Sequence, residues 1–233
     1  MHYWLVMPAA GAGRRFGAAG PKQHAPLAGK TVLELALQTF LDDPRCQAVA
    51  LVVPAASLES ARTQWQGTGR VRLVVGGARR CDSVLAGLDE LAGLAPEEAT
   101  VLVHDAARPC LARADLDRLL AAGAGLADGA LLAAPVSDTL KRASAHGHSE
   151  GTVEREGLWR ALTPQMAPLG RLRALLAQAL ARGVAPTDEA QALEWGGARP
   201  LLVAALAPNP KITLAGDLPL AEALLAQRMT EMP

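Results

Sequence analysis

The chain has 233 residues, half of them hydrophobic and 3% aromatic, so we expect one sizeable core built mainly from Ala, Leu and Val. Lys+Arg and Asp+Glu are balanced at 23 each, which argues against a general partner role with nucleic acid or membrane surfaces. The three cysteines have no CxxC spacing and favour the reducing cytoplasm. No apolar run has the length of a membrane span, and no secretory signal pattern opens the chain.

Short apolar runs alternate with amphipathic segments along most of the chain. The patterns predict strands at 3–7, 47–53, 71–75, 100–104, 130–134 and 201–205, and helices at 31–40, 83–94, 115–126, 172–180, from 187 and from 217. Strands that are apolar nearly throughout are typical of a parallel sheet with helices on both faces. We therefore predict an α/β class, a Rossmann-like, mostly parallel sheet flanked by helices, in a single domain over 1–233.

The alternation lapses between residues 136 and 157. Residues 138–142 and 151–155 are expected to form a protruding β-ribbon arm around a polar tip at 143–150. A two-stranded ribbon is marginally stable alone. Packing against a second subunit resolves this, so we expect a homodimer in which the arm is the dimerisation element.

The segments that follow the strands form the candidate site, because ligands of open α/β sheets bind beyond the carboxyl ends of the strands. The first strand is followed by small residues, whose amides can approach and hold a phosphate chain. Cations recur in or near these loops, where arginine offers a fixed fork of donors to phosphate oxygens. Convergence of the loops would give a basic pocket from Arg14, Arg15, Lys22, Arg79, Arg80, Arg108 and Lys211.

Other interpretations of single motifs are open. Gly11, Gly13 and Gly17 are one residue off the dinucleotide-binding spacing, and the second strand does not end in the acidic residue that this motif needs. No P-loop motif is present. Asp105 could cap a turn through nearby amides, or hold Mg²⁺ beside a triphosphate. His104 is expected to be buried and structural, and His146 and His148 to be solvated on the ribbon tip.

The motifs together resemble the 2-C-methyl-D-erythritol 4-phosphate cytidylyltransferases. The resemblance spans nearly the whole chain in order and rests on the segments 8–15, 21–23, 82–84, 104–109, 138–139, 162–165, 187–190 and 209–213. It implies a nucleotidyltransferase-type fold and transfer of CMP from CTP to methylerythritol phosphate, with a divalent cation such as Mg²⁺, in non-mevalonate isoprene biosynthesis. Pro210 departs from the usual aliphatic residue, and Arg80-Cys81 is an ordinary variation.

The resemblance also implies residue roles. The triphosphate would be cradled by Pro8, Ala9, Ala10, Gly11, Ala12 and Gly13, and the cytosine held by Gly77, Ala78 and Ser83. The catalytic cations would be Arg15, Lys22, Arg155 and Lys211. The metal would be held by Asp105, and the acceptor surrounded by Asp105, Arg108, Thr139, Arg155, Thr163, Thr187 and Lys211. The arm would cross to the neighbouring subunit, so Thr139 and Arg155 are expected to serve the partner's site.

Three other functions share parts of this residue pattern. A cytidylyltransferase for ribitol 5-phosphate would share the cradle and cations, and Thr163, Thr187 and the ribbon favour methylerythritol phosphate. A sugar-1-phosphate nucleotidyltransferase usually has a longer chain and a different base-reading loop. A CTP-sensing module without turnover would not need Arg15, Lys22 and Asp105 together.

Overall fold

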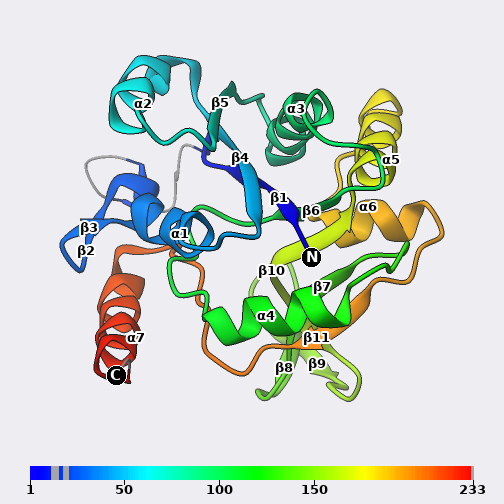
Figure 1. The fold of residues 1–233 in the computed structure, drawn as a ribbon. Coiled ribbons are helices and arrows are strands. Elements are labelled where there is room, and N and C mark those ends of the chain that lie inside the picture. Colours follow the sequence, from blue (N-terminus) through cyan, green and yellow to red (C-terminus); the bar gives the residue numbers. More distant parts are fainter. Residues whose placement is uncertain (12–15, 18–20, 232–233) are drawn as a thin grey trace.

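The computed structural model describes residues 1–11, 16–17 and 21–231 of the chain. Its centre is a seven-stranded sheet in the order β11-β7-β10-β6-β1-β4-β5 (Figure 1). The strands are β1 (Tyr3–Pro8), β4 (Cys46–Val53), β5 (Val71–Val75), β6 (Thr100–Val103), β7 (Ala130–Pro135), β10 (Trp159–Pro168) and β11 (Leu201–Ala204). Every neighbouring pair is parallel except the two that β10 makes, which confirms the predicted α/β class.

Helices cover both faces of this sheet. They are α1 (Val32–Leu41), α2 (Leu58–Gln64), α3 (Arg80–Ala92), α4 (Arg113–Ala122), α5 (Leu169–Ala181) and α6 (Glu189–Trp195), and a further helix, α7 (Leu218–Glu231), lies to one side of the sheet (Figure 1). Helices α1, α2 and α4 contribute to one core cluster, and α3, α5 and α6 to another (Figure 1). Side chains of β4 alternate between the two clusters, as the period of a strand requires. No helix in the described part of the chain is long and apolar enough to cross a membrane.

Strand β10 is absent from the sequence prediction. It pairs antiparallel with β6 and β7 and so occupies the middle of the sheet. Its buried residues include the polar Thr163 and Gln165, and it contains Pro164, all of which are unusual in a central strand. The ladder to β7 is irregular between Ala161 and Gln165, and this irregularity accommodates the proline. The short, largely exposed helix α2 was also not predicted.

Two predicted helices have different ends. Helix α3 begins three residues before the predicted start at Ser83, because the Asp82 carboxylate accepts the Arg79 amide at 2.9 Å and so caps an earlier first turn. Helix α4 ends at Ala122 with Gly123 as its C-cap, short of the predicted Leu126.

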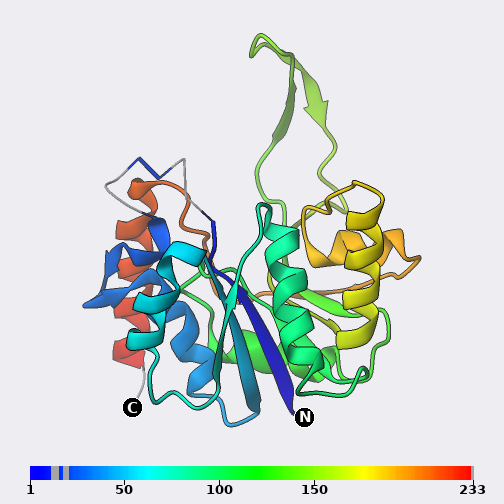
Figure 2. The same ribbon diagram turned by 90° about the horizontal axis from the view of Figure 1, so that it is seen from above.

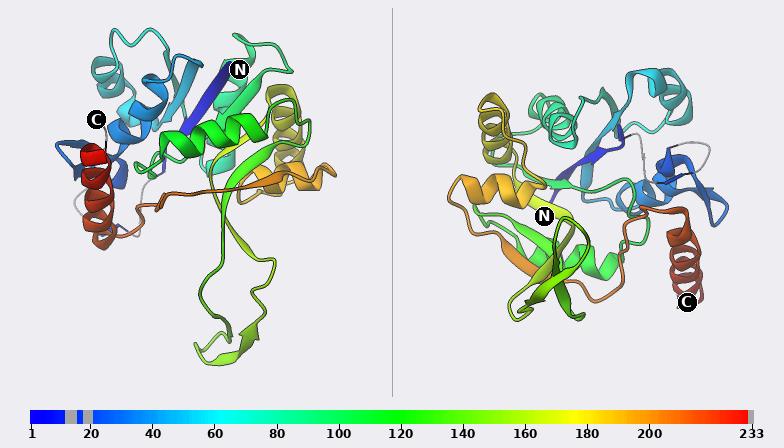
Figure 3. Two further views of the ribbon diagram at one scale, coloured as in Figure 1. Left: turned by 60° about the horizontal axis from the view of Figure 1, so that its bottom comes forward. Right: turned by 180° about the vertical axis from the view of Figure 1, so that it is seen from behind.

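Two further hairpins lie outside the main sheet. Strands β2 (Pro26–Leu27) and β3 (Lys30–Thr31) form a small one next to α7, whose Ala221 shares a core cluster with Leu27 and Ile212. Strands β8 (Leu140–Ala143) and β9 (Ser149–Val153) form the ribbon, which stands away from the body of the protein (Figures 2 and 3). The protruding arm is therefore present, and its tip is shorter than predicted.

Candidate active site

The segments that follow β1, β5 and β6 line one cavity at the carboxyl edge of the sheet. Its walls are Pro8, Ala9, Ala10, Gly11, Lys22, Gln23, Gly77, Ala78, Arg79, Arg80, Ser83, Asp105, Ala106, Ala107 and Lys211. The cavity thus brings together the described members of the predicted CTP cradle, the predicted base-holding residues, and five of the predicted charged residues, namely Lys22, Arg79, Arg80, Asp105 and Lys211. Convergence follows from topology, because the parallel strands β5, β4, β1 and β6 end at the same edge.

Gln23 holds the first wall of the cavity in shape. Its buried Nε2 donates to the carbonyl oxygens of Ala9 at 2.9 Å and Gly11 at 3.2 Å. Lys22, beside it, donates from Nζ to the carbonyl oxygen of Ile212 at 2.7 Å. These bonds tie the turn after β1 to the segment that carries Lys211. The sequence places Gln23 in the motif 21–23 without predicting a role for it; its position next to a candidate lysine is the available signal.

The second wall is a tight turn before α3. The Gly77 amide donates to Ser83 Oγ, and Ser83 Oγ donates to the Arg79 carbonyl oxygen, each at 3.2 Å. A Cβ on Gly76 would lie 2.4 Å from the Cβ of Ala10 and 2.9 Å from Ser83 Oγ. The turn is therefore packed directly against the cradle, and glycine is required there for close approach rather than for an unusual φ.

Asp105 is the centre of the charge in the cavity. Its Oδ2 lies 2.8 Å from Lys211 Nζ, its Oδ1 lies 3.1 Å from the guanidinium of Arg80, and Arg108 Nε is 3.6 Å from Oδ2. Burial alone would raise the pKa of Asp105, but Arg80 and Lys211 outweigh burial and hold this pKa below its ordinary value. The carboxylate is therefore anionic at neutral pH. Its side chain does not cap the turn: the Arg108 amide donates instead to the Asp105 carbonyl oxygen at 3.0 Å.

Thr163 and His104 form a buried hydrogen-bond network behind the Asp105 backbone. The Asp105 amide donates to Thr163 Oγ1 at 3.2 Å, and Thr163 Oγ1 lies 3.0 Å from His104 Nδ1. His104 Nε2 lies 3.0 Å from the Arg108 carbonyl oxygen, which can only accept. Nε2 is therefore the protonated nitrogen, and Thr163 donates its hydroxyl proton to Nδ1. The expectation that His104 is buried and structural is confirmed, since its side chain is fully enclosed.

The remaining predicted acceptor residues lie around this network at different depths. Thr163 is buried, and its hydroxyl is already committed to His104 and Asp105. Arg108 is buried, donates to the Asn209 carbonyl oxygen at 2.7 Å and lines a neighbouring cavity together with Lys211. Burial is the main cause that lowers the pKa of Arg108, with Arg80 and Arg160 adding repulsion. Thr187 is exposed at the approach to α6, whose N-cap is Asp188.

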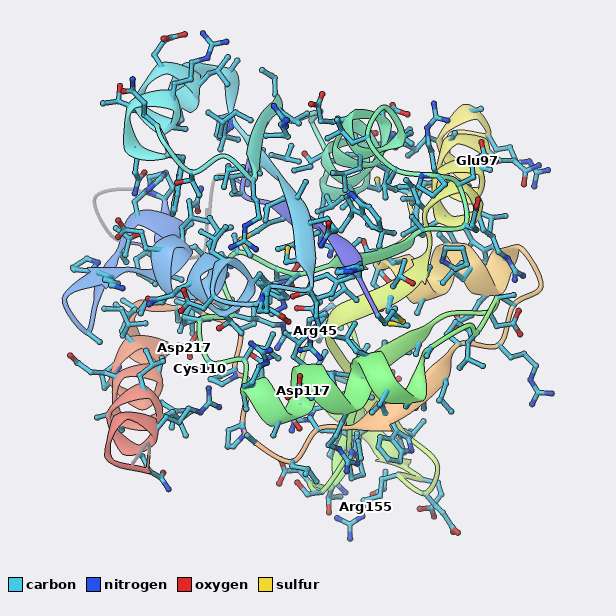
Figure 4. All side chains as sticks on the ribbon, in the orientation of Figure 1. Arg45, Glu97, Cys110, Asp117, Arg155 and Asp217 are labelled. Carbon is cyan, nitrogen blue, oxygen red and sulfur yellow. The ribbon has the colours of Figure 1, made fainter. Side chains whose placement is uncertain are left out.

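Thr139 and Arg155 are not brought to the cavity of their own chain. Both are exposed and lie just outside the ends of β8 and β9, where the ribbon joins the body. The Arg155 guanidinium bonds the Ser137 carbonyl oxygen across the base of the ribbon. Figure 4 places Arg155 at the ribbon end of the molecule, pointing outward. His146 and His148 are exposed at the tip, as expected.

Three predicted site residues, Ala12, Gly13 and Arg15, lie outside the described residues, as does Arg14. The roles of two residues in contact with the site were missed. Arg80 is predicted as part of a basic pocket but with no individual role, and Glu189 appears only within the motif 187–190; the structure joins them by an ion pair of 2.7 Å. Nothing in the sequence indicated this pair, whose members are 109 residues apart.

Known proteins match this chain over nearly its whole length. The family model described as 2-C-methyl-D-erythritol 4-phosphate cytidylyltransferase matches residues 3–227. The chain belongs to this family. The curated enzyme of that name from Halorhodospira halophila is 52% identical over 97% of this chain and 95% of its own.

Solved structures of the family have the same fold. The one titled 4-diphosphocytidyl-2C-methyl-D-erythritol synthase is 37% identical, covers 96% of this chain and 99% of its own, and has a TM-score of 0.82. The cytidylyltransferase from Thermus thermophilus is 32% identical, covers 97% of this chain and all of its own, and has a TM-score of 0.79. The chain is therefore a nucleotidyltransferase with the fold predicted from its motifs.

Proposed function

We propose that the cavity described above transfers CMP from CTP to 2-C-methyl-D-erythritol 4-phosphate and releases pyrophosphate. The products are 4-diphosphocytidyl-2-C-methyl-D-erythritol and pyrophosphate, formed in the non-mevalonate route to isoprenoids. One observation carries the proposal: a small-residue cradle, a tight turn able to hold a base and several cations around a single carboxylate line the same cavity.

The reaction needs no nucleophilic side chain, because the phosphate of the acceptor is itself an anion. One of its oxygens attacks the α-phosphorus of CTP in line, and the bond to the bridging oxygen of pyrophosphate breaks. The barrier is the approach of two polyanions. We assign Lys22, together with Arg15, to the α-phosphate and the leaving pyrophosphate, and Lys211 to the attacking phosphate. Positive groups fixed before the reaction stabilise charge that develops during it.

The donor set around Asp105 fits Mg²⁺. The described residues hold no cluster of three or more His, Cys, Asp or Glu side chains. A single carboxylate at the edge of a phosphate cradle is what Mg²⁺ uses when substrate phosphates and waters supply its other ligands. The ion would neutralise phosphate charge when bound. Asp105 would hold it there, with its carboxylate already ionised and its backbone fixed by Thr163.

The position of the ribbon supports a homodimer with exchanged arms. Thr139 and Arg155 are exposed at its base and away from their own cavity, so a second copy of the chain would have to supply them to each acceptor site. We place the enzyme in the cytoplasm, because Cys46, Cys81 and Cys110 are all buried and unpaired.

The direct test is release of pyrophosphate by the purified protein with Mg²⁺ and CTP. Methylerythritol phosphate is compared with ribitol 5-phosphate and glucose 1-phosphate as acceptors, and CTP with the other three nucleoside triphosphates. We expect efficient release only with CTP and methylerythritol phosphate. Equal or faster release with ribitol 5-phosphate would assign the acceptor pocket to the rival substrate, and release without any acceptor would contradict a transferase.

A further inference from the structure

Arg80 connects two buried carboxylates from distant parts of the chain. It is the first residue of α3, and its guanidinium bonds both oxygens of Glu189, at 2.7 and 3.1 Å. The same guanidinium donates from Nε to Asp105 Oδ1 at 3.1 Å. Glu189 is the first residue of α6 and is only 2% exposed. Arg80 therefore joins the base-holding turn, the candidate metal carboxylate and the acceptor-side segment.

The position of Arg80 at the start of a helix is electrostatically unfavourable for a cation. The N-terminus of α3 carries partial positive charge, which disfavours an arginine in the first turn. Two carboxylates on other elements compensate for it, and the fork of the guanidinium fits Glu189 in a bidentate manner. Among the described residues, Arg80 is the only ion-pair partner of Glu189. Burying this ion pair is costly unless the pair has a role in the site. Loss of Arg80 would leave the buried Glu189 carboxylate without its partner, which is strongly destabilising.

Three cations lie around the Asp105 carboxylate; Arg108 is the most distant at 3.6 Å, and the two nearer ones differ in how firmly they are held. Lys211 contacts Oδ2 and comes from an irregular segment that precedes α7, and its proposed partner during the reaction is the acceptor phosphate. Arg80 contacts Oδ1 and is anchored on its far side by Glu189. When Lys211 turns to the substrate, Arg108 stays 3.6 Å from the carboxylate, and Arg80 is the cation within hydrogen-bond distance that keeps Asp105 in its orientation.

We propose that Arg80 is a positioning residue, anchored by Glu189, that fixes the orientation of the Asp105 carboxylate for the divalent cation. This inference rests on the proposed function, since it takes Asp105 as the metal ligand. It adds a chain of two residues behind that ligand, neither of which has a role in the motifs that identify the family here. Removing such an outer partner of a metal ligand weakens metal binding by about 10- to 100-fold.

The test follows Mn²⁺ binding by electron paramagnetic resonance in the presence of CTP, with binding of metal-free CTP and thermal unfolding measured alongside. In Arg80→Gln we expect about 10- to 100-fold weaker Mn²⁺ binding and a similar loss of kcat. Binding of metal-free CTP is expected to remain near wild type. A loss of metal-free CTP affinity as large as the loss with Mn²⁺ would make Arg80 a direct ligand of the nucleotide and overturn the proposal.

The double variant Arg80→Gln with Glu189→Gln separates positioning from mere stability. It removes the unpaired buried charge, so its unfolding temperature should recover toward wild type, while Mn²⁺ binding stays as weak as in Arg80→Gln. Recovery of Mn²⁺ binding together with stability would reduce Arg80 to a structural ion pair. The control is Arg173→Gln, which removes an exposed ion pair of 2.6 Å to Asp89, also on α3, and should change neither quantity.

The metal assignment itself is tested separately by Asp105→Asn. Retention of wild-type Mn²⁺ binding there would reject Asp105 as the ligand, and with it the proposed metal site. Loss of Mn²⁺ binding in Asp105→Asn combined with wild-type binding in Arg80→Gln would leave the metal site standing and reject only the role of Arg80.

Discussion

The cavity at the sheet edge and the β8–β9 ribbon are opposites in construction. The cavity walls come from segments tied by buried or partly buried hydrogen bonds, such as those of Gln23 and Ser83, whereas the ribbon strands are almost wholly exposed. One chain therefore lines the cavity proposed for the nucleotide and leaves Thr139 and Arg155 outside it. The difference teaches that the walls of the cavity depend on the fold of one subunit, while under the proposed function the acceptor side would draw on a second.

The largest effect is expected at the cavity. Lys22→Ala should lower kcat by about 10²–10³, as the loss of one preorganised donor does elsewhere. Steady-state pyrophosphate release measures this, with Lys30→Ala as the control, because Lys30 is exposed and does not line the cavity. Near wild-type turnover in Lys22→Ala would remove this lysine from the mechanism.

Arg155→Ala should act on the acceptor alone. We expect the KM for methylerythritol phosphate to rise by about 10- to 100-fold, which is the loss of a hydrogen bond to a charged group, with the KM for CTP nearly unchanged. Initial rates at varied concentrations of each substrate separate the two. A variant that lost CTP affinity alone would contradict the division between the cavity and the ribbon.

Acid should destabilise the body of the protein through His104, which sits behind the cavity. Burial lowers the pKa of His104 from 6.5 to about 4, so between these values the unfolded chain binds a proton that the folded chain does not. Stability is therefore complete above about pH 6.5 and is lost as the pH falls toward 4.

Urea unfolding at pH 7 and pH 4.5 measures this loss. Its share from His104 is about 2 kcal/mol and should disappear in His104→Gln. His146→Gln on the exposed ribbon tip should keep the wild-type pH dependence, and an unchanged dependence in His104→Gln would show that the imidazole titrates normally.

The smallest effect expected is on packing in the cavity wall. Gly76→Ala introduces a Cβ that overlaps Ala10, so the cradle must shift, and we expect the KM for CTP to rise about 10-fold through the cost of overpacking. Gly69→Ala is the matched control, because a Cβ there meets no atom within 4 Å. Equal KM values for CTP in the two variants would show that the turn at Gly76 can move away from Ala10 without disturbing the cradle.

The parts of the fold that follow local rules could be predicted from the sequence. The apolar strands β1 and β4 and the amphipathic α1 and α5 are found at or near the predicted residues. Strand β10 could not be predicted in this way, because Pro164 and the buried polar residues beside it are typical of a loop. Its place in the sheet depends on pairing with β6 and β7, which no local pattern encodes.

The site also has a part that general rules predict and a part that depends on tertiary packing. The rule that ligands bind at the carboxyl ends of strands was sufficient to gather Ser83, Asp105 and the cradle. The ion pair of Arg80 with Glu189 could not be predicted, because it depends on how α3 and α6 pack beside the sheet. The resemblance to a family named the candidate residues but not the bonds that hold them.

The most direct test of the central claim, that the cavity of one subunit works with the arm of another, is complementation between two impaired variants. Lys22→Ala and Arg155→Ala are co-expressed, and pyrophosphate release is measured at a low acceptor concentration against each variant alone. Random pairing in a symmetric dimer with exchanged arms restores one intact site in every mixed dimer, giving roughly a quarter of wild-type activity. Activity no higher than the mean of the two separate variants would contradict arm exchange.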